Sequence, residues 1–86
     1  SEKSYSDFDK MFIEVYHDFY NNLNAMASLF QKDLRLASYI IMNISINEIT
    51  TISGVSLRTV ESQRYRLSKK LNLKKDQNLN SFLLSI

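Results

Sequence analysis

The sequence contains no cysteine, no proline and a single glycine. Without cysteine there can be neither a disulfide framework nor a cysteine-based zinc site. No apolar run approaches the roughly 18 residues that a membrane-spanning helix needs, and the polar, acidic N-terminus is unlike a signal peptide. We therefore expect a soluble, cytoplasmic protein, and a chain of 86 residues predicts one small domain.

Residues with catalytic chemistry are equally scarce. His17 is the only histidine, and the carboxylates are scattered singly along the chain. There is neither a glycine-rich loop to hold phosphates nor a G-x-S-x-G nucleophile motif. The sequence therefore predicts a protein that is not an enzyme, with no catalytic residue, no metal ligand and no cofactor.

Charge is unevenly distributed between the two parts of the chain. Residues 1–53 carry four basic and seven acidic side chains, a net charge of −3, whereas residues 54–86 carry seven basic and two acidic ones, a net charge of +5. A basic region on an otherwise acidic domain is typical of proteins that bind polyanions.

The basic region begins inside a pattern that predicts two helices joined by a tight turn. Ser45 and Glu48 have the spacing of a capping box, in which each side chain bonds the other residue's amide. Gly54 can adopt a positive φ at no steric cost, and Ser56 is placed to cap a second helix. An apolar stripe on the first helix is formed by Ile46, Ile49 and Ile52. Together these features predict a helix-turn-helix.

The second helix, residues 57–71, has two different faces when stepped at about 100° per residue. One side gathers Val60, Gln63, Arg64, Leu67 and Leu71. The opposite side gathers Arg58, Glu61, Ser62, Tyr65, Arg66 and Lys69. A merely solvated face needs only charge, so this mixture of cations, hydrogen-bonding groups and one aromatic ring favours nucleic-acid recognition. Arg64, on the inward flank, is expected to pair with Glu48 or Asp33, because a free buried guanidinium is costly.

These residues resemble the LuxR-type (GerE-like) bacterial DNA-binding domain, whose pattern runs roughly S-N-K-E-I-A, five residues, S, two residues, T-V-K, then K-L-G-V. The matching residues are Ser45, Glu48, Ile49, Ser56, Thr59, Val60, Lys70, Leu71 and Leu73. Residues 56–71 are closer still to a branch found at the C-terminal end of long sensor-regulators, in which S-x-R-x-I/V-E-x-x-R-Y-R-L-x-K-K-L is usual. The similarity covers about residues 29–86.

The resemblance implies roles for positions along the second helix. Glu61, Ser62 and Tyr65 would face the bases of DNA in the major groove, and Arg58, Thr59, Arg66 and Lys69 would lie nearer the phosphates. From their places in the caps, in the turn and on the inward flank of the second helix, we expect structural roles for Ser45, Glu48, Gly54, Ser56 and Arg64.

Four positions depart from the family pattern, one of them Thr50 in place of a small alanine. Glu61 replaces a common lysine, and its carboxylate could accept a bond from cytosine N4 or form a salt bridge within the helix, with Arg58 or Arg64. Phe30 stands where the family has a capping threonine, and Ser28 with Gln31 offers a substitute capping box. Asn43 replaces a glycine at a helix end, where asparagine tolerates a positive φ.

The rest of the chain also has helical periodicity. An aromatic stripe comprises Tyr5, Phe8, Phe12, Val15, Phe19, Met26 and Leu29, with Asn22 in one slot, and we expect packing as its role and a break near residues 16–18. Residues 33–42 are apolar on most sides, which predicts burial against Ile49, Ile52 and Val60 on one side and the aromatic stripe on the other. After a loop at residues 74–78, a last helix presents Leu79, Phe82, Leu83 and Ile86.

The sequence thus predicts an all-α fold, a small bundle of five or six helices containing a helix-turn-helix. We expect a helical extension at residues 1–30 packed on a LuxR-type domain at residues 31–86. The predicted function is sequence-specific binding of double-stranded DNA as the output domain of a bacterial transcriptional regulator. Its expected partners are upstream sensor or signalling domains, with homodimerisation through those upstream parts. The alternatives are a helical protein-interaction or dimerisation module with a basic docking face, and an RNA-binding domain.

Overall fold

The computed structural model describes the backbone of residues 2–86 and the side chains of residues 6–86, so the predicted contribution of Tyr5 to the aromatic stripe lies outside the described side chains. Over residues 2–86 the chain forms helices and no strand, which confirms the all-α prediction. The six helices are α1 (Glu2–Val15), α2 (His17–Met26), α3 (Gln31–Ile41), α4 (Ile46–Ser53), α5 (Leu57–Lys70) and α6 (Leu79–Ser85).

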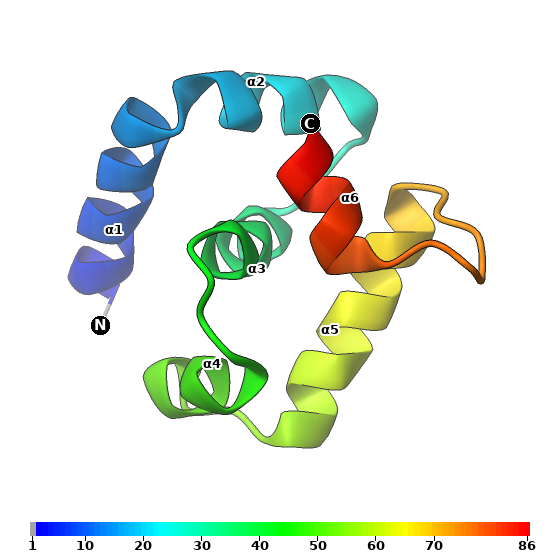
Figure 1. Ribbon diagram of the computed structural model, residues 1–86. Helices are drawn as coiled ribbons and strands as arrows, with labels where there is room; N and C mark the ends of the chain where they lie inside the picture. Colours follow the sequence, from blue (N-terminus) through cyan, green and yellow to red (C-terminus); the bar gives the residue numbers. More distant parts are fainter. Residues whose placement is uncertain (1) are drawn as a thin grey trace.

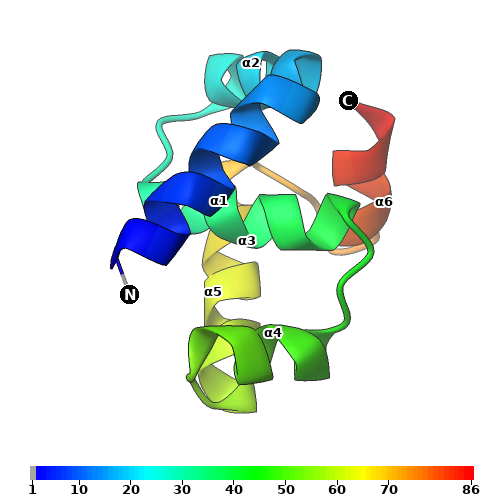
Figure 2. The same cartoon turned by 90° about the vertical axis from the view of Figure 1, so that its left-hand side faces the viewer.

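Helix α3 lies at the centre of the molecule. Figure 1 views it nearly end-on, with α1 and α2 on one side, α4 and α5 on the other, and α6 beside it. The turned view in Figure 2 shows α1 crossing α3 on the side away from α5. The core residues of all six helices are Phe12, Phe19, Leu23, Leu36, Ala37, Tyr39, Ile40, Ile49, Val60, Leu67, Leu79 and Leu83. Most of the residues that α3 buries are aliphatic or aromatic, as its apolar pattern predicts, and Asp33 and Ser38 are buried with them.

The N-terminal segment forms two helices with a break at Tyr16 (φ −113°, ψ 44°), which confirms the expected break. The buried stripe differs in part from the predicted one, since Leu23 is fully buried while Val15 and Met26 are 64% and 48% exposed. In α1 the buried side follows steps of four residues, from Phe8 to Phe12 and on to Tyr16 at the break. The prediction was wrong for Val15 because it lies three residues after Phe12, whereas the buried side of α1 continues four residues after it, at Tyr16. It was wrong for Met26 because this residue is the last of α2 and stays about half exposed there, although it is in phase with Phe19.

Helices α1 and α3 are joined by an aromatic contact and an ion pair. The rings of Phe8 and Tyr39 have centroids 5.3 Å apart. The Arg35 guanidinium donates two hydrogen bonds to the Asp9 carboxylate, at 3.3 and 2.9 Å, and Gln31 donates another at 2.6 Å. Both charged side chains are largely buried. This corner fixes α1 against α3, while the division of the chain at residue 30 stays a prediction.

The start of α3 is stabilised differently from the expectation. Phe30 occupies the position before the helix, and the Asp33 carboxylate accepts a bond from its amide at 3.0 Å. Lys70 Nζ lies 2.6 Å from the same Asp33 oxygen and 4.0 Å from the centroid of the Phe30 ring. The proposed Ser28–Gln31 capping box was wrong, because α3 begins at Gln31 and the side chain of Gln31 bonds α1 instead.

The segment between α3 and α5 follows the predicted turns, with one exception in the apolar stripe. Asn43 has φ 61°, as expected for the end of α3. Ile49 is buried, but Ile52 is 50% exposed, so its predicted place in the core was wrong. Residues three apart drift by about 60° around a helix with each step, which carries Ile52 well away from Ile46. The predicted loop at residues 74–78 and the last helix are both present.

Candidate nucleic-acid interface

Local hydrogen bonds define helix α4 and the turn after it. Ser45 Oγ accepts a bond from the Glu48 amide, and the Glu48 carboxylate accepts one from the Ser45 amide, both at 3.1 Å. Hydrogen bonds with Ser45 lower the pKa of Glu48 from its ordinary value. The Ser45 side chain lowers this pKa more than the Ser45 backbone does. Gly54 has φ 70°, and its amide donates to the Thr50 carbonyl at 2.9 Å. These are the cap and turn geometries that the sequence predicts.

The first turn of α5 is capped by Ser56. Its Oγ accepts a bond from the Thr59 amide at 3.1 Å and lies 3.0 Å from the Thr59 hydroxyl. Val60 and Leu67 have no exposed surface and dock α5 on the core. Since these two residues lie on one side of the helix, they fix which side chains of α5 face outward.

The outward face of α5 carries the predicted set of side chains. All six are exposed: Arg58, Glu61, Ser62, Tyr65, Arg66 and Lys69. All but Lys69 line a shallow, open hollow along the helix. Lys69 Nζ lies 5.4 Å from the centroid of the Tyr65 ring, and Tyr65 is 63% exposed. Thr59 lies at the edge of this face, half-buried. We call the six exposed residues the outer face of α5.

Glu61 makes no ion pair in the part of the chain whose side chains are described. The pairs found there are His17–Asp18, Asp9–Arg35 and Asp33–Lys70. The salt bridge that the sequence allowed between Glu61 and a neighbouring arginine is therefore not among them. The carboxylate instead borders the hollow, beside two arginines and a hydroxyl group.

The predicted carboxylate partner of Arg64 was wrong. Asp33 pairs with Lys70, and Glu48 caps its own helix. Arg64 Nη2 instead donates to the side-chain oxygen of Asn80 on α6, at 2.8 Å. Burial lowers the pKa of Arg64 from its ordinary value. No local pattern could reveal Asn80, because it lies 16 residues along the chain and meets α5 only through the tertiary fold.

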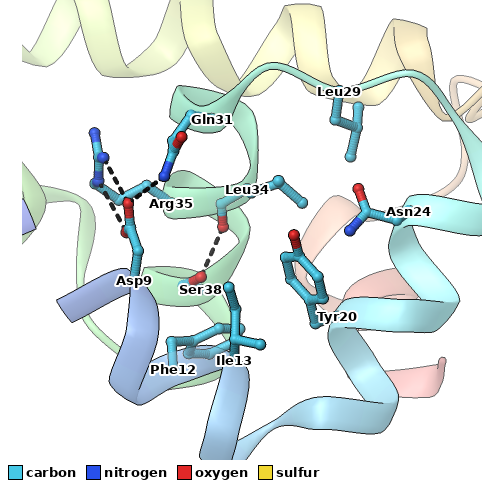
Figure 3. Close-up of a pocket in the computed structure, with 10 residues that line it drawn as sticks. All are labelled: Asp9, Phe12, Ile13, Tyr20, Asn24, Leu29, Gln31, Leu34, Arg35 and Ser38. Carbon is cyan, nitrogen blue, oxygen red and sulfur yellow. Dashed lines mark hydrogen bonds and ion pairs between the residues drawn. The ribbon is translucent and has the colours of Figure 1, made fainter. Parts of the chain in front are cut away.

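A separate cavity of about 280 Å³ lies between α1, α2 and α3. Figure 3 shows the Asp9 cluster of hydrogen bonds on one side of it and the side chains of Tyr20 and Asn24 on the other. The only carboxylate in its lining is Asp9, which already accepts bonds from Arg35 and Gln31. The lining therefore presents no pair of free titratable groups of the kind that acid–base chemistry uses.

The described residues form neither a metal site nor a membrane-spanning helix. No cluster of three or more histidine or carboxylate side chains there could hold a metal ion. None of the helices has both the length and the apolar character required to cross a membrane.

The chain is similar to the transcriptional regulatory protein TdiR of Thauera aromatica. The two are 32% identical over 63 residues, which make up 73% of this chain and 28% of TdiR. The matched part is thus little more than a quarter of that regulator. No protein-family model matches the chain, and no solved structure matches it.

Proposed function

We propose that this chain binds double-stranded DNA as the output domain of a bacterial transcriptional regulator of the LuxR type. The observation that carries the proposal is the outer face of α5, which follows a capped glycine turn and presents cations, hydrogen-bonding groups and an aromatic ring together. The similarity to a transcriptional regulatory protein supports the same class of function.

In this proposal α5 lies in the major groove. An α-helix with its side chains is about 10–12 Å wide and the groove about 12 Å, so one helix fills it. Glu61, Ser62 and Tyr65 face the base edges, where hydrogen bonds read sequence. The phosphate contacts come from Arg58, Thr59, Arg66 and Lys69; Thr59 already shares its hydroxyl with Ser56, so its position is fixed before DNA binds.

Salt dependence tests whether phosphates are bound. Each phosphate neutralised by a cation releases counterions, so Lys69→Ala should lower the slope of log affinity against log salt by about one for every DNA sequence. Lys10→Ala, an exposed lysine on α1, is the matched control and should leave the slope unchanged. Fluorescence anisotropy with duplex DNA over a salt series measures both. Equal slopes for the two variants would remove Lys69 from the interface, and absence of binding by the wild type would reject the proposal.

Glu61 is expected to set sequence preference. A carboxylate repels phosphate but accepts a hydrogen bond from cytosine N4, so it lowers non-specific affinity and favours cytosine at one position. The free position of Glu61 beside the hollow supports this role. Selection from randomised duplexes with wild type and Glu61→Gln should show loss of the cytosine preference and tighter non-specific binding. An unchanged preference would contradict base reading.

At the level of the whole regulator, we propose a cytoplasmic protein that carries sensor or signalling domains upstream and dimerises through them, without catalytic activity in this domain. One recognition helix spans few base pairs, and dimers place two of them about one helical turn apart. Sedimentation of residues 1–86 at micromolar concentration should then show a monomer or weak dimer. A tight dimer would place the dimer interface in this domain.

The same binding series separates the other functional classes. A docking module for an acidic protein would bind duplex DNA with little sequence preference, and an RNA-binding domain would favour single strands, whose bases stack on aromatic side chains. Only Tyr65 among the aromatic residues lies on the outer face of α5. Competition between duplex DNA and single-stranded RNA of the same sequence should therefore favour the duplex.

A further inference from the structure

Arg64 holds a positive charge without a counter-charge. Its side chain is half-buried at the edge where α5 meets α6, and its hydrogen-bond partner is the neutral amide of Asn80, 2.8 Å away. None of the ion pairs among the side chains of residues 6–86 includes it. A half-buried charge is stabilised when an anion approaches it, because burial has removed part of its hydration.

The guanidinium also has hydrogen-bonding capacity left over. It carries five N–H donors in a rigid fork, and one of its nitrogens bonds Asn80. The Asn80 amide accepts that bond through its oxygen, which leaves its own NH₂ group as a further donor on the same edge. Two adjacent groups with free donors, one of them charged, match the acceptor oxygens of a phosphate.

The position of Arg64 on α5 suits contact with one wall of the major groove. Stepping about 100° per residue places Arg64 about 60° inward of Glu61, on the flank of α5. A helix that fills the major groove has its flanks next to the phosphates that line the groove, since helix and groove are both roughly 12 Å wide. Arg66, about 160° away from Arg64 around the helix, lies toward the opposite wall.

We propose that Arg64 and Asn80 form a binding site for a backbone phosphate of the DNA strand that runs along the α5–α6 edge. This site rests on the proposed function of α5 and adds α6 to the DNA-binding surface. Asn80 is its positioning residue: it holds the guanidinium in place without neutralising it. An aspartate at the same point would form an ion pair with Arg64 and cancel the charge that the phosphate needs.

Asn80→Asp tests this directly. The new carboxylate should leave the melting temperature unchanged or raise it, because it pairs with Arg64, yet it should weaken DNA binding and lower the salt slope by about one. Ser81→Asp is the matched control, since it adds the same charge on the next residue of α6, whose side chain has no bond to Arg64. The control should keep the wild-type salt slope.

A second variant keeps the test valid whatever the stability of the first. Arg64→Gln should lower the salt slope by about one by itself, and in that background Asn80→Asp should weaken binding no more than Ser81→Asp does. Two results would contradict the phosphate site in a wild type that binds duplex DNA: Asn80→Asp behaving as Ser81→Asp does, or Arg64→Gln keeping the wild-type salt slope. Either result would mean that α5 alone binds DNA. Absence of DNA binding by the wild type would instead overturn the proposed function on which the site rests.

Discussion

The α4–α5 turn and the corner of α1, α2 and α3 are held together in opposite ways. Bonds around the turn join residues three or four apart, such as Ser45 with Glu48. In the corner, Arg35 reaches 26 residues back to Asp9. Outside the corner, Lys70 ties α5 to Asp33 across 37 residues. The turn therefore sets the shape of the outer face of α5, whereas the corner and the Lys70 contact set the position of that face on the domain.

Leu23→Ala should give the largest effect, because it acts on the long-range packing. Leu23 is fully buried in α2, and such a truncation costs about 2–5 kcal/mol of unfolding free energy. Met26→Ala, three residues later and 48% exposed, should change it by less than about 0.5 kcal/mol. Urea denaturation measures both, and similar losses would contradict the buried stripe through Leu23.

Lys70→Met should have the next largest effect. Removing the ammonium leaves the buried Asp33 carboxylate with only the Phe30 amide, at a cost of about 1–3 kcal/mol. Lys69→Met, on the neighbouring exposed residue, should be nearly neutral for stability. If both variants melted at the wild-type temperature, the ion pair between α5 and α3 would contribute nothing to the placement of α5.

Gly54→Ala probes the local side of the comparison. A Cβ at this position would meet no atom within 4 Å, so the cost comes from the backbone at φ 70° alone, about 1–2 kcal/mol. Gly54→Asn should recover part of the loss, because asparagine adopts this conformation more readily. Thermal denaturation distinguishes them; an alanine variant as stable as the wild type would show that the turn tolerates another geometry.

The capping box should give the smallest effect, visible only in acid. Since folding lowers the pKa of Glu48 from 4.5, its contribution to stability is present above that pH and is lost as the pH falls through the lowered value. The stability difference between wild type and Glu48→Gln should therefore be constant above pH 4.5 and shrink below it. An NMR titration of the Glu48 carboxyl group gives its pKa directly, and an undisplaced value would contradict the bond to Ser45.

The sequence predicted the local contacts of the molecule but not its long-range ones. The caps at Ser45 and Ser56, the turn at Gly54 and the exposed side of α5 were predictable because each depends on residue types a few positions apart. The partners of Arg64 and Lys70 were not, since a helical wheel gives the direction of a side chain but not the element that meets it. The role of Ile52 was misjudged within a single helix, because spacing by three follows the helix only approximately.

The break at Tyr16 shows an intermediate case. The sequence indicated that the helix would be interrupted near Tyr16, but not whether the buried side would continue by steps of three or of four residues. The predicted stripe stepped three residues from Phe19 to Asn22, whereas the buried face steps four residues to Leu23, and a helix allows both steps. The roles of Glu61, Ser62 and Tyr65 toward DNA stay predictions that the binding experiments decide.

The shortness of α6 has a consequence for the order of folding. Isolated helices of fewer than about 12–15 residues are marginal in water, and α6 has seven residues, whose buried side chains Leu79 and Leu83 belong to the common core. Its contact with α3 closes a loop that contains all of α4 and α5, whereas the α4–α5 turn closes within a few residues. Since longer loops cost more entropy to close, we expect the turn to form early in refolding and α6 to dock late.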